Sequence, residues 1–322
     1  MKFVDMFCGI GTIRMGFEKA NWECVYSIEW DKFKRGIYNV IFGNEPEGSD
    51  IRSIRADDIP KADCWTFGAP CQDFSISGKR KGLEGDRSSL VREVFRLVRE
   101  TKEEYRPKYL LYENVKGMFS SNKGLDYFEI LFEMESLGYD IEWQLLNSKD
   151  FGVPQNRQRV FTIGHLRGRG GRKIFPIGGI NSKTIDKIVS TGHQATDVYS
   201  IEGVSSTLIA NGGGQGGKTG LYLIGNLDRP QTNDFSNRVY SSEGIGRTLM
   251  GSGGGSSDKT GLYMNKGRIR RLTPREAWRL QGISDKITDK VMAAGISDSQ
   301  MYRGAGDACT VNVIYEIAKR FR

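Results

Sequence analysis

Histidine is scarce in this sequence: His165 and His193 are the only two among 322 residues. Because imidazole is the side chain that titrates near neutral pH, its scarcity assigns acid–base work to carboxylates, arginine or water. Cysteine is present but unpaired, since five form an odd set without CxxC spacing: Cys8, Cys24, Cys64, Cys71 and Cys309. This pattern argues against a disulfide framework and against a metal site, and it favours a reducing compartment.

Long apolar runs are also missing. The first residues, MKFVDMFCGIG, lack the apolar segment of a signal peptide, and no later stretch is long enough for a transmembrane helix. We therefore expect a soluble protein of the cytoplasm.

Acidic residues are outnumbered: 47 Lys and Arg stand against 39 Asp and Glu, which gives a net charge of +8. The excess is concentrated in two segments. Residues 151–180 hold basic residues and no acid, and residues 266–279 hold Glu276 as their only acid. Scattered surface charge would be less segregated, so these segments favour a partner with a phosphate backbone.

Segments typical of strands and of helices alternate from residue 1 to about residue 165. Strands are predicted for the apolar runs KFVDMF, ECVYSIE, DCWTF, KYLLYENV, YDIEWQLL and RVFTIGHL, with helices between several of them. This alternation is typical of an α/β fold with a doubly wound, mostly parallel sheet. Residues 300–322 predict one amphipathic helix that returns to this first domain.

After residue 166 glycine becomes dense and helical periodicity disappears, which predicts a second, smaller and irregular β-rich domain. It contains a tandem repeat, because residues 199–223 and 240–264 are identical at 14 of 25 aligned positions. We expect a catalytic domain of residues 1–165 completed by residues 300–322, a small domain of residues 166–285 and a hinge of residues 286–299.

A glycine turn, Phe7-Cys8-Gly9-Ile10-Gly11, follows the first predicted strand. Glycines at such a turn let the backbone approach a ligand, and an acid after the second strand, here Glu29, can bind ribose hydroxyls. Nicotinamide-dependent oxidoreductases share this layout, so the turn alone is a weak signal. Arg14 stands where GxGxxG requires its third glycine, which weighs against the oxidoreductase alternative.

Polar residues also follow the third and fourth predicted strands. Cys71 lies directly behind Pro70 in GAPCQDFSISGKRKG, and by itself it is an ordinary loop cysteine. Glu113 and Asn114 end the fourth strand, where alone they serve equally well as a cap for the next turn. The QNRQR segment at residues 155–159 is, taken alone, a solvated basic stripe.

Together, and in this order, these segments resemble the DNA (cytosine-5) methyltransferases of bacteria and phages. DMFCGIG, IEWD and GSDI are similar to the family's first three motifs, GAPCQDFS to its nucleophile motif and ENV to its sixth. QNRQR, RRLTPREAWRLQG and YRGAGDACTVNVI resemble the eighth, ninth and tenth motifs. The resemblance spans nearly the whole chain. It implies transfer of a methyl group from S-adenosylmethionine to carbon 5 of cytosine in a specific short sequence of double-stranded DNA.

The resemblance assigns the chemistry to three residues. Cys71 would be the nucleophile that adds to carbon 6 of a cytosine flipped out of the duplex, which activates carbon 5 by covalent catalysis. Glu113 would hydrogen-bond ring nitrogen 3 and the amino edge of the base, and Arg159 would hold the ring's carbonyl oxygen.

S-adenosylmethionine, released as S-adenosylhomocysteine, would be held by residues of several motifs. Glu29 would bind the ribose, Trp30 would lie against the adenine and Asp50 would accept from its amino group. The implied cofactor-binding set is Phe7, Gly9, Gly11, Glu29, Trp30, Asp50, Ile51, Pro70 and Asp307. Asp307 departs from the family pattern, because an asparagine is usual there and its amide donor is lost. Thr12 replaces a common glycine.

DNA contacts are implied for the polar run of residues 75–85, which resembles the family's mobile loop, and for the repeat, whose Thr-Leu pair marks the family's target-recognition region. The implied DNA-binding residues are Ser75, Lys79, Arg80, Lys81, Arg157, Thr248, Leu249 and Thr260. Support of its own loop is the alternative role for Arg157. A folding unit without base contacts is the alternative for the repeat.

The resemblance also implies a monomer near the nucleoid of a bacterial or phage-infected cell, with a cognate restriction endonuclease present but not in direct contact. Two alternatives stay open. A tRNA methyltransferase of the same superfamily typically carries a Cys-Phe-Thr signature, which this sequence lacks. A catalytically inactive DNA-binding protein is opposed by the intact set of Cys71, Glu113 and Arg159, and only Asp307 speaks for it.

Overall fold

The computed structural model describes four stretches of the chain in full: residues 1–69, 90–169, 171–178 and 272–321. Between residues 179 and 271 it describes only the backbone of short strands. The chain forms two compact units, one of residues 1–146, 159–178 and 313–322 and one of residues 147–158 and 179–312. The catalytic, small and hinge segments that we expected stay a prediction.

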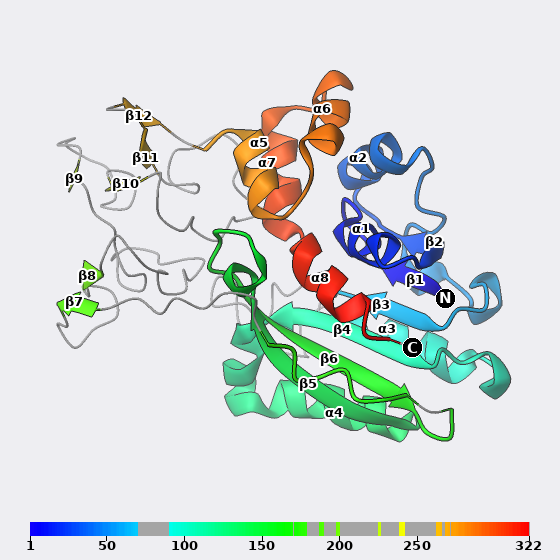
Figure 1. Ribbon diagram of the computed structural model, residues 1–322. Helices are drawn as coiled ribbons and strands as arrows, with labels where there is room; N and C mark the ends of the chain where they lie inside the picture. Colours follow the sequence, from blue (N-terminus) through cyan, green and yellow to red (C-terminus); the bar gives the residue numbers. More distant parts are fainter. Residues whose placement is uncertain are drawn as a thin grey trace. The chain divides into compact units, whose positions relative to one another are not determined.

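The first unit is built on a six-stranded sheet with the order β2-β1-β3-β4-β6-β5 (Figure 1). Its strands are β1 (Lys2–Met6), β2 (Glu23–Ile28), β3 (Cys64–Phe67), β4 (Tyr109–Val115), β5 (Tyr139–Asn147) and β6 (Gln158–Leu166). β1 pairs in parallel with β2 and β3, β3 pairs in parallel with β4, and β6 runs antiparallel to β4. The predicted doubly wound, mostly parallel sheet is confirmed, with β6 as an antiparallel member.

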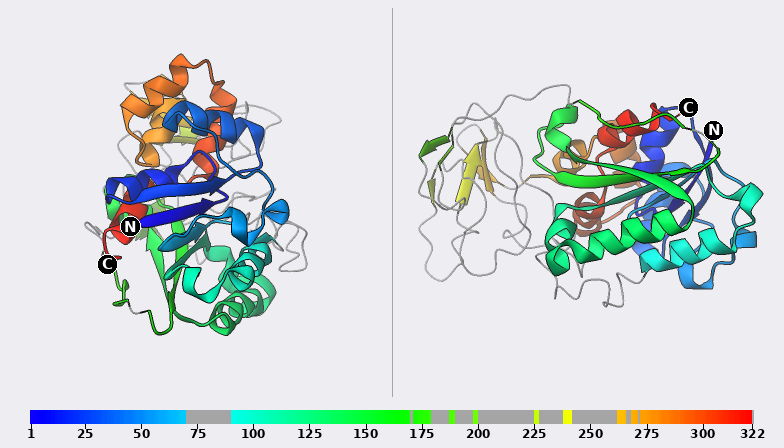
Figure 2. Two further views of the ribbon diagram at one scale, coloured as in Figure 1. Left: turned by 90° about the vertical axis from the view of Figure 1, so that its right-hand side faces the viewer. Right: turned by 90° about the horizontal axis from the view of Figure 1, so that it is seen from below.

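Helices cover both faces of this sheet (Figure 2). They are α1 (Thr12–Lys19), α2 (Lys32–Phe42), α3 (Leu90–Glu100), α4 (Leu125–Ser136) and α8 (Val311–Ala318). Helices α3 and α4 lie on one face, whereas α1 and α8 lie on the other (Figure 2). The α1–α8 contact is close, because a Cβ added at Gly16 would lie 2.5 Å from Cγ2 of Ile314. Covered on both faces, β3 is buried at every residue.

Helix α2 has an aspartate cap at its start. The carboxylate of Asp31 accepts hydrogen bonds from the backbone N–H groups of Phe33 and Lys34, at 2.9 and 3.1 Å. These bonds satisfy two donors that the first helical turn leaves without partners. The helix ends at Gly43, whose φ of 82° favours glycine.

The point at which the sheet reverses its strand order lies between β1 and β3. From β1 the chain adds β2 on one side, and it later adds β3 on the other side. In open α/β sheets, ligands bind outside the carboxyl ends of the strands at such a point. Residues 7–11 follow β1 and residues 68–69 follow β3, so the topology brings these two turns to one edge.

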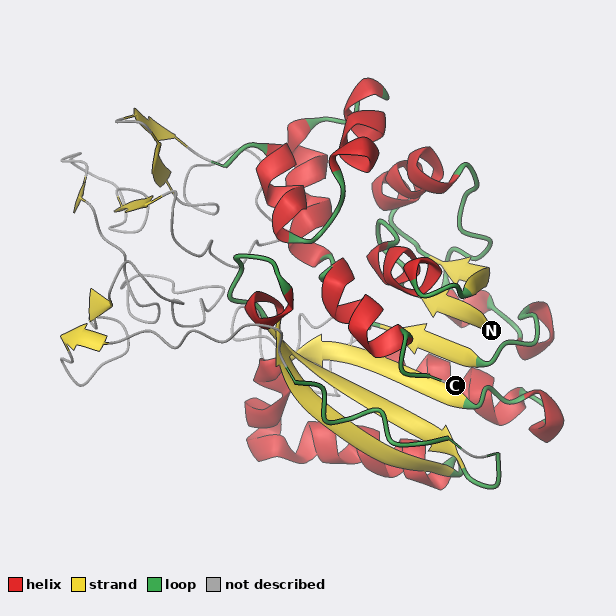
Figure 3. Cartoon of the chain, in the orientation of Figure 1, coloured by secondary structure: helices red, strands yellow, loops and turns green. Residues whose placement is uncertain are grey.

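Short 3₁₀ helices join the longer elements of the chain, whose helices, strands and loops are coloured in Figure 3. They are η1 (Ile51–Ser53), η2 (Ala56–Asp58), η4 (Glu103–Tyr105), η5 (Lys116–Gly124) and η6 (Ser148–Phe151). The first of them, η1, contains Ile51 and is preceded by its N-cap Asp50, and both residues were expected at the cofactor.

The second unit contains three helices and two small sheets among the described residues. The helices are α5 (Pro274–Leu280), α6 (Asp285–Ala293) and α7 (Asp298–Asp307). One sheet has the order β12-β11-β10-β9 and the other pairs β7 with β8. The strands are β7 (Lys187–Val189), β8 (Val198–Tyr199), β9 (Gly225–Asn226), β10 (Arg238–Ser241), β11 (Leu262–Asn265) and β12 (Arg268–Arg270).

These strands include the two ends of the second repeat copy. β10 and β11 pair in parallel and place Tyr240 opposite Tyr263, so the start and the end of residues 240–264 are hydrogen-bonded neighbours. The first copy also starts on a strand, because β8 ends at Tyr199. The middle of both copies lies outside the described residues.

The single C-terminal helix that we expected over residues 300–322 is wrong. The structure has two helices there, because Ala308 adopts an extended conformation (φ −73°, ψ 151°) between α7 and α8. The Arg157 guanidinium donates to the carbonyl oxygens of Gly306 and Ala308, at 2.9 and 3.0 Å. Carbonyls satisfied by a side chain do not need a further helical turn. The apolar periodicity continues across the break, so it could not reveal it.

Candidate active site

The turn after β1 has an unusual backbone. Phe7, Gly9 and Gly11 have positive φ angles of 61°, 58° and 85°. For a phenylalanine this left-handed conformation is rare, and such strain concentrates at functional sites. The two glycines serve different ends. A Cβ on Gly9 would meet nothing within 4 Å, whereas one on Gly11 would lie 2.3 Å from the ring of Phe42. Gly9 therefore leaves room for a ligand, and Gly11 permits helix packing.

Glu29 ties this turn to the end of β2. Its side chain is buried, and its two carboxylate oxygens accept from the backbone N–H groups of Gly9 (2.9 Å) and Asp31 (2.8 Å). A carboxylate has about four acceptor positions, so both oxygens can accept a further hydrogen bond. The neighbouring Trp30 is 74% exposed and free to meet a flat ligand with its face. This donor and acceptor set suits a ribose with an adjacent base.

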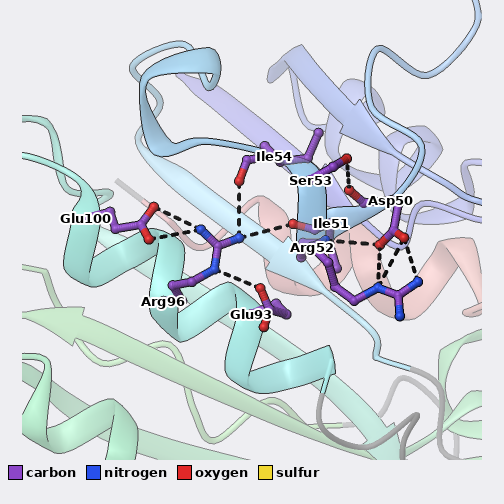
Figure 4. A network of polar contacts seen from close by, with 8 residues as sticks. All are labelled: Asp50, Ile51, Arg52, Ser53, Ile54, Glu93, Arg96 and Glu100. Carbon is purple, nitrogen blue, oxygen red and sulfur yellow. Dashed lines mark hydrogen bonds and ion pairs between the residues drawn. The ribbon is translucent and has the colours of Figure 1, made fainter.

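Asp50 and Ile51 lie at the start of η1 (Figure 4). The Asp50 carboxylate accepts from the Arg52 side chain, with its shortest contact at 2.6 Å from a terminal guanidinium nitrogen. Its pKa is lowered, chiefly by this hydrogen bond to Arg52. Ile51 is buried, so its side chain fixes the turn in the core. The turn thus presents one ionised carboxylate at a defined position.

Glu113 and Arg159 are brought together by the pairing of β4 with β6. Val115 lies opposite Arg159 in this antiparallel pair, so Glu113, two residues before Val115, is on the same face as Arg159. The guanidinium Nε lies 3.2 Å from the Glu113 Oε1, and both side chains are largely buried, at 14% and 18% exposed. A Cβ added at Gly68 would lie 3.1 Å from the other carboxylate oxygen.

Asn114 is a polar residue whose role the sequence left open between a cap and a site. It is buried, and its amide nitrogen donates to the Tyr112 hydroxyl at 2.7 Å and to the Ala69 carbonyl at 3.4 Å. Its amide oxygen accepts from the Val115 N–H at 2.8 Å. Asn114 therefore fastens the end of β4 to the last described residue before Pro70 and Cys71.

Arg157 is buried, with 3% of its surface exposed, and its guanidinium contacts the backbone carbonyls that end α7. A side chain this buried has little surface to offer a phosphate, so the structure favours the supporting role over the DNA-binding role. Asp307 is exposed at the last position of α7. A negative charge there faces the negative end of the helix dipole.

Asp5 is a buried acid that the sequence analysis did not single out. It lies in β1, next to its last residue, and burial raises its pKa to about 7. The Thr66 hydroxyl donates to one carboxylate oxygen at 3.0 Å, and the other has no hydrogen-bond partner among the described residues. An acid inside the apolar run KFVDMF was the signal that could have revealed it.

Nine of the expected site residues lie outside the described residues: Pro70, Cys71, Ser75, Lys79, Arg80, Lys81, Thr248, Leu249 and Thr260. Their assigned roles stay predictions. Within the described part of the chain, no helix is long and apolar enough to cross a membrane. In the same part, no group of three or more histidine, cysteine or acidic residues is placed to hold a metal ion.

Comparisons with known proteins show which family the chain belongs to. The family described as C-5 cytosine-specific DNA methylase matches residues 1–322. Type II methyltransferase M.HhaI of Haemophilus parahaemolyticus is 34% identical over 355 residues, which cover 99% of this chain and 93% of the relative. Type II methyltransferase M.DsaV of Dactylococcopsis salina is 30% identical, with 99% of this chain and 85% of the relative covered.

Two solved structures share the fold. The methyltransferase EhMeth of Entamoeba histolytica has a TM-score of 0.68 at 17% identity, covering 98% of this chain and 96% of its own. The S. pombe Dnmt2 methyltransferase has a TM-score of 0.67 at 18% identity, covering 99% and 97%. The Rossmann-like fold is thereby confirmed, and the match over residues 1–322 shows that the chain belongs to the C-5 cytosine-specific DNA methylases, enzymes that methylate cytosine in DNA with S-adenosylmethionine.

Proposed function

We propose that this enzyme methylates a cytosine that is flipped out of a specific short sequence of double-stranded DNA, through a covalent adduct with Cys71. One observation carries the proposal. Glu113 and Arg159 form a largely buried pair beside Gly68, three residues before Cys71 in the sequence. An acid and a guanidinium on one face can hydrogen-bond the edge of a single flipped base.

The cofactor site is proposed at the carboxyl ends of β1 and β2. Glu29 would hold the ribose hydroxyls with the acceptor capacity that Gly9 and Asp31 leave free. Open space beside Gly9 and the exposed face of Trp30 fit the remainder of a nucleoside. When bound, S-adenosylmethionine supplies a methyl group on a positively charged sulfur, which leaves as a neutral thioether.

The proposed reaction has three steps: addition, methyl transfer and elimination. The Cys71 thiolate adds to carbon 6 of the cytosine, and the electron pair of the carbon 5–carbon 6 double bond becomes available at carbon 5. Carbon 5 then forms its bond to the methyl group while the methyl–sulfur bond breaks. Water accepts the proton from carbon 5, the double bond re-forms, and the thiolate leaves carbon 6.

Glu113 and Arg159 would stabilise charge during the addition step. Glu113 would hydrogen-bond ring nitrogen 3 and the amino group of the base, where negative charge develops as the thiolate adds, and Arg159 would donate to the carbonyl oxygen. Both groups are positioned before the base arrives, by pairing of β4 with β6, so little reorganisation is needed at the moment of reaction. Asn114 would keep the end of β4 aligned with the strand turn that leads to Cys71.

DNA reading is proposed for the repeat of residues 199–223 and 240–264, with a folding unit as the alternative. Contacts to phosphates would come from Ser75, Lys79, Arg80 and Lys81. We further propose a monomer that acts in the cytoplasm of a bacterial or phage-infected cell, alongside a cognate restriction endonuclease that it does not contact.

Covalent trapping tests the proposal. Duplex DNA that carries 5-fluorocytosine in the target site cannot lose a proton from carbon 5, so it should form a stable adduct when S-adenosylmethionine is present. The Cys71→Ser variant should lose the adduct while it still binds DNA. An adduct that survives in Cys71→Ser would show that another residue is the nucleophile.

A further inference from the structure

Arg96, in the middle of α3, makes more polar contacts than its place on a helix surface requires (Figure 4). One terminal nitrogen of its guanidinium donates to the carbonyl oxygens of Ile51, at 3.2 Å, and of Ile54, at 3.1 Å. These carbonyls belong to η1 and to the residue that ends it. Arg96 therefore joins α3 to a turn that lies 45 residues earlier in the sequence.

Two acids on the same helix hold this guanidinium in place. Glu93 accepts from Nε at 2.7 Å, and Glu100 accepts from the other terminal nitrogen at 2.9 and 3.0 Å. The Arg96 side chain is 31% exposed, so solvent only partly competes for these bonds. With each nitrogen of the fork engaged, the guanidinium has one orientation, in which it faces η1.

The turn needs such support. η1 is three residues long, and its closing backbone bond, from Ile54 N–H to the Ile51 carbonyl, measures 3.3 Å. A single 3₁₀ turn has poor hydrogen-bond geometry and little stability of its own. Burial of Ile51 supplies one tertiary contact, and Arg96 supplies a directional one. The Asp50 carboxylate itself accepts from the guanidinium of Arg52, which belongs to the same turn.

We propose that Arg96 is a positioning residue for the cofactor: it holds η1 so that the carboxylate of Asp50 is in place for the adenine amino group before the cofactor binds. The inference rests on the proposed function, because it takes Asp50 as a residue that contacts the adenine. Arg96 acts only through the carbonyls of Ile51 and Ile54. Its removal loosens the turn, so binding the cofactor must then order it, which weakens affinity without altering the chemical step.

Arg99 provides a matched control on the same helix. Its side chain is also partly exposed and forms an ion pair, with Glu133 at 3.0 Å, and this contact joins α3 to α4 and not to η1. Three variants are compared with the unaltered protein: Arg96→Ala, Arg96→Lys and Arg99→Ala. Lysine keeps the charge near Glu93 and Glu100 but lacks the fork that reaches two carbonyls and two acids together.

Calorimetric titration with S-adenosylhomocysteine should give a Kd about tenfold higher in Arg96→Ala, which corresponds to about 1.4 kcal/mol. Arg96→Lys should lie between this value and that of the unaltered protein, and Arg99→Ala should be within twofold. At saturating S-adenosylmethionine, kcat should stay within twofold in all three. Hydrogen exchange of the ligand-free protein should be faster at the Ser53 and Ile54 amides only in the Arg96 variants.

A merely structural Arg96 would lower the melting temperature as Arg99→Ala does and leave the Kd and the Ser53 and Ile54 amides unchanged, which would overturn the inference. If Arg96→Ala does not fold, the same measurements on Arg96→Lys test the inference. If the unaltered protein fails to bind S-adenosylhomocysteine, the proposed function is wrong. If it binds and the exchange rates respond but the Kd does not, only the inference is wrong.

Discussion

Gly11→Ala should destabilise the fold more than the addition of a methyl group at any other position of the turn after β1. Gly11 has a φ of 85°, and the new Cβ would lie 2.3 Å from Cε2 and 2.8 Å from Cζ of Phe42. The left-handed conformation costs an L-residue about 1–2 kcal/mol. Overpacking against a ring costs about 1–3 kcal/mol more. We therefore expect a loss of about 2–5 kcal/mol in the free energy of unfolding.

Gly43→Ala is the matched control. Gly43 ends α2 with a φ of 82°, but a Cβ there would meet nothing within 4 Å. It should cost only the conformational part, about 1–2 kcal/mol. Urea denaturation monitored by circular dichroism gives both values, provided that the m-values of the variants agree.

A double-mutant cycle separates the steric part from the backbone part. Phe42→Leu removes the ring that the new methyl group would strike, so Gly11→Ala should cost less in a Phe42→Leu background than in the unaltered protein. The difference should approach the overpacking cost of about 1–3 kcal/mol. Equal losses in Gly11→Ala and Gly43→Ala, or no coupling to Phe42, would refute the packing argument for Gly11.

Three further outcomes are expected. Burial raises the pKa of Asp5 to about 7 from its ordinary 3.8, so the folded state retains the Asp5 proton at a higher pH than the unfolded state. The contribution of Asp5 to stability is full below about pH 4 and is lost as pH rises through 7. The urea midpoint should therefore fall less with pH in Asp5→Asn than in the unaltered protein. Arg157→Met removes the donor from the carbonyls of Gly306 and Ala308 and should lower the free energy of unfolding by about 1–3 kcal/mol for each carbonyl. The salt dependence of DNA binding should stay unchanged. A weaker salt dependence would instead support a phosphate contact by Arg157. Asp307→Asn should tighten S-adenosylmethionine binding by no more than about 1.5–3 kcal/mol, and calorimetry that shows equal or weaker binding would contradict the missing-donor argument.

Local sequence was sufficient for most of the first unit. Apolar runs of four to nine residues fix where a strand can be buried on both faces, and the predicted strands recur as β1 to β6. Asp31 caps α2 through its own neighbours, at Phe33 and Lys34, so that helix start is readable from a few adjacent letters. Motif order along the chain identified the family for the same reason: each motif is a short local pattern of residues.

Contacts between distant segments were decided by the tertiary structure alone. Glu113 and Arg159 are 46 positions apart, and their ion pair depends on β6 lying beside β4 in a register that places Val115 opposite Arg159. A strand's pattern states which face is apolar, but it does not name the partner strand or the register. The family resemblance could therefore assign both residues to the same chemistry, but the sequence could not show that they contact each other.

Burial separated residues that the sequence treated alike. Arg157 and Arg159 stand two positions apart in QNRQR, yet the first supports the end of α7 and the second pairs with Glu113. The break between α7 and α8 has the same origin, because the helix ends where a distant guanidinium satisfies its last carbonyls. Arg96 carried no signal at all, since an arginine among glutamates on a helix is an ordinary surface pattern until the fold brings Ile51 and Ile54 to its guanidinium. Hydrogen-bond partners that lie far apart in the chain are a property of the packed molecule, and only the folded structure supplies them.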